Sequence, residues 1–167
     1  MSTPTQANAA TRETAQGGKF LTFYLAGEEY GLEILKVHEI IGMLPITRVP
    51  RTPEFVRGVI NLRGKVIPIV DLRTKFGMGH EGALETSIIV VLVRGVQIGI
   101  VVDKVSEVLD IASADIEATP SFGAEVDTRY LLGLAKTAGR VRLLLDIEHV
   151  LSASEIIDLQ SVRSDAA

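Results

Sequence analysis

Residue types that could perform chemistry are sparse in this chain of 167 residues, which has three histidines and no cysteine. The lack of cysteine excludes disulfides, thiolate metal sites and cysteine nucleophiles. No histidine has metal-ligand spacing, no serine lies in a Gly-x-Ser-x-Gly turn, and no glycine-rich loop forms a phosphate cradle. We interpret all three histidines as ordinary polar residues: His38, His80 and His149. We therefore expect no catalytic residue, no metal ligand, no cofactor and no enzyme activity.

The residue that stands out instead is Arg63, a charge at the tip of an otherwise apolar hairpin. Two aliphatic runs within 57–72 flank the turn Asn61-Leu62-Arg63-Gly64, in which Gly64 can adopt positive φ without steric cost. The second run is short and rich in Val and Ile, which predicts a buried strand. Asp71 follows that strand and is the predicted cap of a helical turn over 72–76. The stretch therefore predicts a rigid β-hairpin that presents one arginine.

The two halves of the chain resemble each other, which indicates an internal repeat. Three blocks recur in the same order, with offsets of 68 (95 minus 27), 67 (119 minus 52) and 75 (133 minus 58) residues: 27–40 with 95–108, 52–55 with 119–122, and 58–72 with 133–147. Each copy holds about five short strands, which satisfy their edges most easily by curling into small barrels. The predicted fold is mainly β, with two pseudo-repeated five-stranded barrels, short connecting helices and a C-terminal helix.

The predicted organisation has three parts. Residues 1–18 contain few apolar side chains, so we expect a disordered N-terminal arm. The folded domain is expected over 19–151, and a C-terminal helix and tail over 152–167. Within the domain, the barrel units are expected at about 28–85 and about 86–147, with the first strand, 19–25, linking them.

Three local predictions concern helical segments. A short helix is expected to begin with Thr52 as its N-cap and Pro53 in its first position. A single helical turn is expected over 35–38. Helical spacing runs from Asp146, a second predicted cap, to about Arg163.

Comparison of the two copies separates turn chemistry from function at Arg63. The segment Asn61-Leu62-Arg63 corresponds to Lys136-Thr137-Ala138, so the second copy forms the equivalent turn without an arginine. Arg63 is then either a solvated loop charge or a functional residue. Aliphatic residues exceed what two small barrels need for a core, and a subset beside Arg63 would form an apolar groove suited to an amphipathic helix. For most of them, packing in the core or in the seam between barrels is the plainer interpretation: Val37, Ile40, Ile41, Val101, Val102, Val105 and Val108.

Composition restricts the environment and the partners. The formal net charge of -4 argues against nucleic acid as a partner, because phosphate binding needs a basic face. No apolar run approaches the roughly 20 residues of a membrane span, and the N-terminus has no apolar core of a secretory signal. We expect a cytoplasmic protein without direct membrane contact.

Several motifs resemble the CheW family of bacterial chemotaxis coupling proteins. The most specific is the block from Thr52 to Leu72, with Asn61-Leu62-Arg63-Gly64 and the strand that ends in Asp71-Leu72. Phe23 to Gly31, Ile34 to Ile40 and Gly99 to Val105 add to it, so that the resemblance spans nearly all of 19–151. It implies two five-stranded SH3-like barrels and a non-catalytic adaptor.

The resemblance also implies partners and contact residues. Its partners would be the regulatory domain of the histidine kinase CheA and the helical cytoplasmic tip of chemoreceptors (methyl-accepting chemotaxis proteins), in membrane-associated arrays. The implied receptor-binding residues are Val37, Glu39, Ile40, Gly58, Arg63, Gly99, Val105 and Val108, and the implied kinase-binding residue is Phe122. Arg63 would bond an oxygen of the receptor helix, and Gly58 would allow its close approach. A small-ligand binding module, with its site between the barrels, is the alternative.

Overall fold

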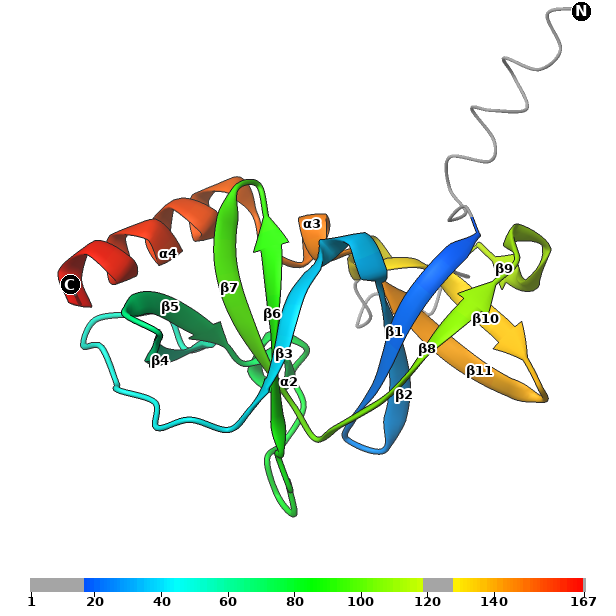
Figure 1. Cartoon of the computed structure of the whole chain (residues 1–167), viewed down its shortest axis with the longest axis horizontal. Helices are drawn as coiled ribbons and strands as arrows, with labels where there is room; N and C mark the ends of the chain where they lie inside the picture. The colour runs from blue at the N-terminus through cyan, green and yellow to red at the C-terminus, as the bar shows by residue number, and fades with distance from the viewer. Residues whose placement is uncertain (1–16, 119–127, 167) are drawn as a thin grey trace, which may run out of the picture.

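The computed structural model describes residues 17–118 and 128–166 (Figure 1). The strands are β1 (Gly18–Leu25), β2 (Glu28–Glu33), β3 (Val37–Gly42), β4 (Val56–Leu62), β5 (Lys65–Val70), β6 (Ser87–Val93), β7 (Val96–Val102), β8 (Lys104–Ile111), β9 (Ile116–Glu117), β10 (Leu131–Thr137) and β11 (Arg140–Leu145). The helices are α2 (Leu72–Lys75), α3 (Ile147–Val150) and α4 (Ala153–Ala166), with 3-10 turns η1 (Ile34–Lys36), η2 (Ser113–Asp115) and η3 (Thr128–Tyr130). The mainly β prediction with short helices is therefore confirmed.

The strands form two sheets that do not follow the two copies of the sequence repeat. One sheet has six strands in the order β8-β1-β2-β11-β10-β9, and the other has five in the order β3-β6-β7-β5-β4. The first hairpin of each copy, β1–β2 or β6–β7, thus joins the later strands of the other copy. This differs from the units expected at about 28–85 and about 86–147, because a repeat shows which segments are alike and not which segments pair.

Two equivalent glycines make this exchange of hairpins possible. Strand β2 lies parallel to β11 at Gly31, and β7 lies parallel to β5 at Gly99. A Cβ on Gly31 would lie 2.8 Å from Leu144 Cδ2, and a Cβ on Gly99 would lie 2.6 Å from Ile69 Cδ1. Both distances are inside van der Waals contact, so a side chain at either position would force the buried Leu144 or Ile69 side chain to move.

The outer strands of the five-stranded sheet, β3 and β4, are connected by the segment between them. Thr47 donates its N–H to the Val59 carbonyl and accepts the Val59 N–H, both at 2.8 Å. The approach is closest at Gly58, which has a φ of 142° and where a Cβ would lie 2.2 Å from the Thr47 carbonyl oxygen. The segment around Thr47 therefore lies against β4 and covers part of the otherwise open edge of this strand.

One hydrophobic core spans the junction of the two sheets. It contains Leu21 and Leu32 from the six-stranded sheet together with Ile89 and Ile100 from the five-stranded sheet. Four stacked or tilted rings run through it, with centroids 5.8, 6.2 and 5.4 Å apart in the order Phe23, Tyr30, Phe76, Tyr130. Burial, with a smaller effect of the Glu28 charge, raises the pKa of the Tyr30 hydroxyl to about 12. The sheets are therefore halves of a single packed body.

The predictions of helical segments in the first copy of the repeat are partly wrong. No helix begins at Thr52, whose hydroxyl donates to the Val49 carbonyl at 2.9 Å instead of capping a helix. The helical turn expected over 35–38 is η1, over 34–36, and β3 already begins at Val37. The predicted cap is confirmed at Asp71, which accepts the Thr74 N–H at 3.2 Å.

The predictions near the C-terminus also need correction. Asp146 makes no side-chain cap bond and instead contacts His149 Nδ1 at 2.6 Å. The continuous helical stretch is broken at Leu151 and Ser152 into α3 and α4. Ser152 and Glu155 form a reciprocal capping box, with bonds of 2.8 and 3.2 Å, and the spacing Ser-x-x-Glu would have predicted it.

Candidate functional site: a hairpin arginine and its neighbours

Arg63 lies at the tip of the β4–β5 hairpin in a two-residue turn. Arg63 and Gly64 have φ values of 51° and 87°, and Asn61 Oδ1 accepts the Gly64 N–H at 2.9 Å. The equivalent turn at Ala138 and Gly139 has nearly the same φ values, 52° and 74°. Because an alanine satisfies this backbone equally well, the turn itself does not explain the arginine.

The carboxylate partner of Arg63 comes from the opposite edge strand of the same sheet. Its Nη2 donates to Glu39 Oε1 on β3 at 2.5 Å. The Arg63 side chain is 69% exposed and that of Glu39 is 25% exposed. Two of the residues implied by the resemblance are thus brought together, although 24 positions separate them. The pair leaves most of the five guanidinium N–H donors facing solvent.

Four aliphatic candidates fall into two pairs related by the repeat. Val37 on β3 and Val105 on β8 are half-buried against the shared core. Ile40 and Val108, three residues further along the same strands, are 44% and 49% exposed. Each sheet therefore contributes one anchored and one exposed aliphatic side chain to the candidate surface.

The two glycine candidates are buried and contact the protein's own backbone or core. Gly58 packs against Thr47, and Gly99 packs against Ile69 and Ile88. Close approach is needed at both positions, and within the described residues the approaching atoms come from this chain. Phe122, the candidate on the kinase side, lies outside the described residues.

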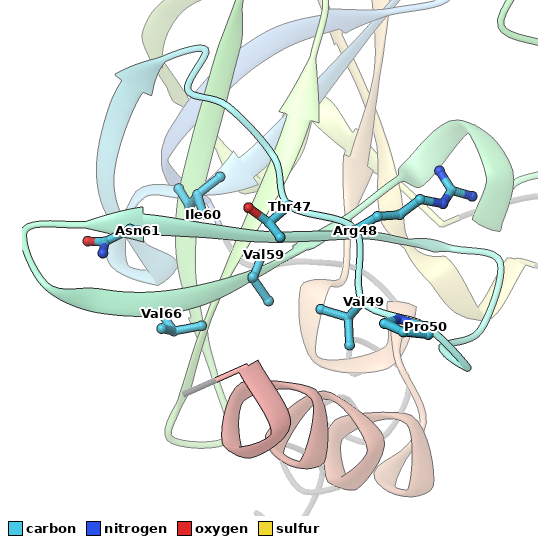
Figure 2. Close-up of a pocket in the computed structure, with 8 residues that line it drawn as sticks. All are labelled: Thr47, Arg48, Val49, Pro50, Val59, Ile60, Asn61 and Val66. Atoms are coloured by element: carbon cyan, nitrogen blue, oxygen red, sulfur yellow. The ribbon is translucent and has the colours of Figure 1, made fainter.

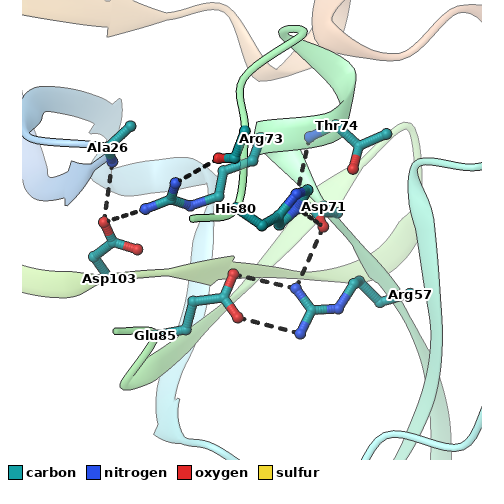
Figure 3. A network of polar contacts seen from close by, with 9 residues as sticks. Ala26, Arg57, Asp71, Arg73, Thr74, His80, Glu85 and Asp103 are labelled. Atoms are coloured by element: carbon teal, nitrogen blue, oxygen red, sulfur yellow. Dashed lines mark hydrogen bonds and ion pairs between the residues drawn. The ribbon is translucent and has the colours of Figure 1, made fainter. Parts of the chain in front are cut away.

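Sequence reasoning missed a polar network at the base of α2 (Figure 3). Arg57 donates two hydrogen bonds to the Glu85 carboxylate, at 3.1 and 3.2 Å. Its Nη1 also donates to Asp71 Oδ2 at 3.3 Å. The same oxygen, Asp71 Oδ2, also contacts His80 Nε2 at 2.7 Å. Burial opposes ionisation of Asp71, yet the bonds from His80 and Thr74 and the Arg57 charge together hold its pKa below the usual value. The network fastens the connector of 78–86 to the five-stranded sheet.

A pH dependence follows from the Asp71 network. A carboxyl group whose pKa is lowered on folding stabilises the protein above its unfolded pKa of about 3.9, and this contribution is lost as the pH falls through the folded value. We expect Asp71→Asn to lower the free energy of unfolding at pH 7 by about 1–3 kcal/mol. The deficit relative to the parent should shrink toward about pH 3. Urea unfolding at both pH values measures it, with exposed Asp110→Asn as the control; an unchanged deficit at low pH would contradict the assignment.

Two surface hollows bear on the small-ligand alternative. One, of about 320 Å³, lies beside the 47–50 segment and the β4–β5 hairpin (Figure 2). Its lining is Thr47, Arg48, Val49, Pro50, Val59, Ile60, Asn61 and Val66. The other, of about 420 Å³, lies between the β1–β2 turn and the connector, and its lining includes Arg73 and Asp103, which pair with each other at 2.6 Å. Apart from that pair, each lining contains a single charged residue, Arg48 in the first hollow and Glu81 in the second. Residues 17–118 and 128–166 contain no metal-binding cluster.

Taken together, the described residues define a mainly β protein whose exposed ion pair and aliphatic side chains suit a protein-interaction surface. The family model of the CheW-like domain matches residues 19–155. The chain therefore belongs to the CheW-like domain family. Among the described helices, none has the length and apolar character required to cross a bilayer.

Similar proteins agree with this membership. The chemotaxis protein CheW of Klebsiella aerogenes is 44% identical over 147 residues, which cover 87% of this chain and 89% of that protein. The chemotaxis protein CheW of Rhizobium meliloti is 35% identical and covers 89% of this chain and 96% of that protein. The crystal structure of the scaffolding protein TtCheW from Thermoanaerobacter tengcongensis superposes with a TM-score of 0.74, at 38% identity over 84% of this chain and 96% of that one.

Proposed function

We propose that this chain is a non-catalytic chemotaxis adaptor that couples transmembrane chemoreceptors to the histidine kinase CheA. The proposal is supported by family membership and by relatives that are chemotaxis and scaffolding proteins. The observation that carries it is the exposed Arg63–Glu39 pair at the tip of a rigid hairpin. The adaptor works in the cytoplasm, where its partners hold it at the receptor arrays.

The proposed receptor surface combines one polar contact with aliphatic contacts from both sheets. Arg63 offers its remaining donors to carbonyl or carboxylate oxygens of the receptor helix, while Glu39 fixes the guanidinium in place. Ile40 and Val108 supply exposed apolar area, with half-buried Val37 and Val105 beneath. An apolar centre with a polar rim is the arrangement expected of a helix-binding groove.

Gly58 and Gly99 contribute to this surface indirectly in our proposal. Gly58 lets Thr47 close onto β4, and Gly99 lets β7 pair with β5. They thereby hold the hairpin of Arg63 and the strand of Glu39 in register. On the kinase side, we propose that Phe122 contacts the regulatory domain of CheA. The coupling is then positional, since receptor and kinase are held by one protein and no bond is made or broken.

The first test is Arg63→Ala. Removal of an interface anchor should weaken binding of the purified receptor tip by about 1–2 kcal/mol, roughly 5- to 30-fold in Kd. The free energy of unfolding should change by less than about 0.5 kcal/mol, because the side chain is exposed and alanine already occupies the equivalent turn. Calorimetric titration with the receptor tip and, separately, with the CheA regulatory domain measures both interactions.

Arg51→Ala is the matched control, since Arg51 is also exposed and also has positive φ, 63°, but lies in the loop before β4. It should leave both affinities unchanged. Equal loss of receptor binding in the two variants would contradict a specific role for Arg63, and failure of the parent protein to bind either partner would refute the adaptor function.

A further inference from the structure

Two clusters of charged residues join the two sheets at opposite ends of their junction. The first links Asp103, in the crossover from β7 to β8, to the β1–β2 turn and to α2. Asp103 Oδ2 accepts the Ala26 N–H at 3.0 Å and the Arg73 Nη2–H at 2.6 Å. We name Ala26, Arg73 and Asp103 the buried clamp, because Arg73 is only 4% exposed.

The second cluster occupies the corresponding place in the other half. Glu148 on α3 binds Lys36, in the crossover from β2 to β3, at 3.0 Å. Arg94 in the β6–β7 turn donates to the Glu148 carbonyl at 3.1 Å, and its Nε lies 3.8 Å from Glu148 Oε1. We name Lys36, Arg94 and Glu148 the exposed clamp, since these side chains are 30–40% exposed.

The two clamps occupy equivalent places in the repeat, but the signs of the charges in the crossover and on the short helix are exchanged. Arg94 corresponds to Ala26 at the offset of 68 (94 minus 26), and Glu148 corresponds to Arg73 at the offset of 75 (148 minus 73). Each clamp joins a hairpin turn, a crossover and a short helix. In Figure 1 the β1–β2 turn and the β7–β8 crossover lie at the bottom, whereas α3 and the β6–β7 turn lie at the top.

We infer that the exposed clamp is a salt-sensitive latch, and that the buried clamp is the pivot about which the two sheets change their angle when the latch opens. An ion pair shielded from water is screened little by salt, whereas partly exposed charges are screened strongly. Isolated surface pairs contribute little, but this cluster joins three elements of two sheets and therefore acts on their orientation. Opening would widen the spacing between β3 and β8.

This latch would regulate the receptor surface, and that part of the inference rests on the proposed function. Ile40 and Val108 belong to different sheets, so the angle between the sheets sets whether one helix can contact both. Glu39 and Arg63 lie within one sheet and would keep their contact when the angle changes. The latch thus changes how Ile40 and Val108 contact the receptor helix, while the Glu39–Arg63 pair stays intact.

Pulsed electron–electron distance measurement tests the latch without any partner. The chain has no cysteine, so spin labels can be placed at exposed Leu92 on the five-stranded sheet and exposed Val141 on the six-stranded sheet. We expect Glu148→Gln to shift and broaden the label-to-label distance distribution. In the parent, salt at about 1 M, where the screening length is about 3 Å, should reproduce the Glu148→Gln distribution.

Lys19→Gln is the matched control, because its exposed partner Asp110 lies in the same sheet. It should leave the distribution unchanged. An unchanged distribution in Glu148→Gln would overturn the latch whether or not the protein binds receptors. If the distribution responds, receptor-tip affinity should fall about fivefold or more in Glu148→Gln, the lower end of ordinary coupling between sites; unchanged affinity would overturn the regulatory part. Failure of the parent to bind would count against the proposed function alone.

Discussion

Arg73→Met should lower the free energy of unfolding by about 3 kcal/mol, although Arg73 lies in no predicted site. Its guanidinium is buried between the Asp103 carboxylate and the Gly79 carbonyl, at 2.6 and 2.8 Å. Removal of one partner of a buried ion pair leaves the other charge without compensation, at a cost of about 3–5 kcal/mol. The lower end applies because the Asp103 side chain retains 19% exposure. Urea unfolding at neutral pH measures the loss.

Two further variants make the Arg73 result interpretable. The double variant Arg73→Met/Asp103→Asn removes the unpaired charge and should recover about 1–2 kcal/mol relative to Arg73→Met. Lys19→Met breaks the exposed pair with Asp110 and should cost less than about 1 kcal/mol. If Arg73→Met cost no more than Lys19→Met, the buried clamp would have no role in stability.

Gly58→Ala should destabilise the protein by about 2–6 kcal/mol, because two costs add at this position. A non-glycine residue held at a rarely populated φ costs about 1–3 kcal/mol, and overpacking against fixed atoms costs about 1–3 kcal/mol more. The new methyl group would lie 2.2 Å from the Thr47 carbonyl oxygen, which its bond to the Val59 N–H holds in place. Thermal and urea unfolding measure the effect.

Gly42→Ala is the control for Gly58→Ala, since a Cβ on Gly42 of β3 meets no atom within 4 Å. It should change stability by less than about 0.5 kcal/mol. A Gly58→Ala variant with the parent's stability and weakened receptor binding would show that Gly58 contacts the receptor directly. Loss of binding only in proportion to unfolding would agree with the buried position that we describe.

Much of the fold was accessible from local pattern. Aliphatic runs on both sides of Asn61-Leu62-Arg63-Gly64 located the β4–β5 hairpin, and the repeat indicated two similar groups of strands. A strand that local pattern did not indicate is β8, which pairs with β1 through a register shift between Leu21 and Phe23. The Thr22 hydroxyl fills that irregularity by bonding to the Glu107 carbonyl and N–H at 2.9 and 3.2 Å. The extra residue disturbs the alternation by which a strand is recognised in sequence.

The candidate site was accessible only in part. Arg63 could be singled out because the second copy of the turn lacks it, but its pairing with Glu39 depends on how the edges of a sheet approach each other. The buried positions of Gly58 and Gly99 depend on contacts with segments distant in sequence, Thr47 and Ile69. Ion pairs such as Arg73–Asp103, 30 positions apart, have no local signature either.

The exchange of hairpins between the two halves also dictates the order in which the sheets can form during synthesis. All five strands of the sheet that carries Arg63 have been made once the ribosome has passed Val102, so that sheet can close early. The hairpin β1–β2 emerges first, yet its neighbours β8 and β11 end at Ile111 and Leu145. Its apolar face, which includes Phe23 and Leu32, must wait until those neighbours have been made. Until then, the edges of this hairpin are open to pairing with other chains unless the early sheet covers them.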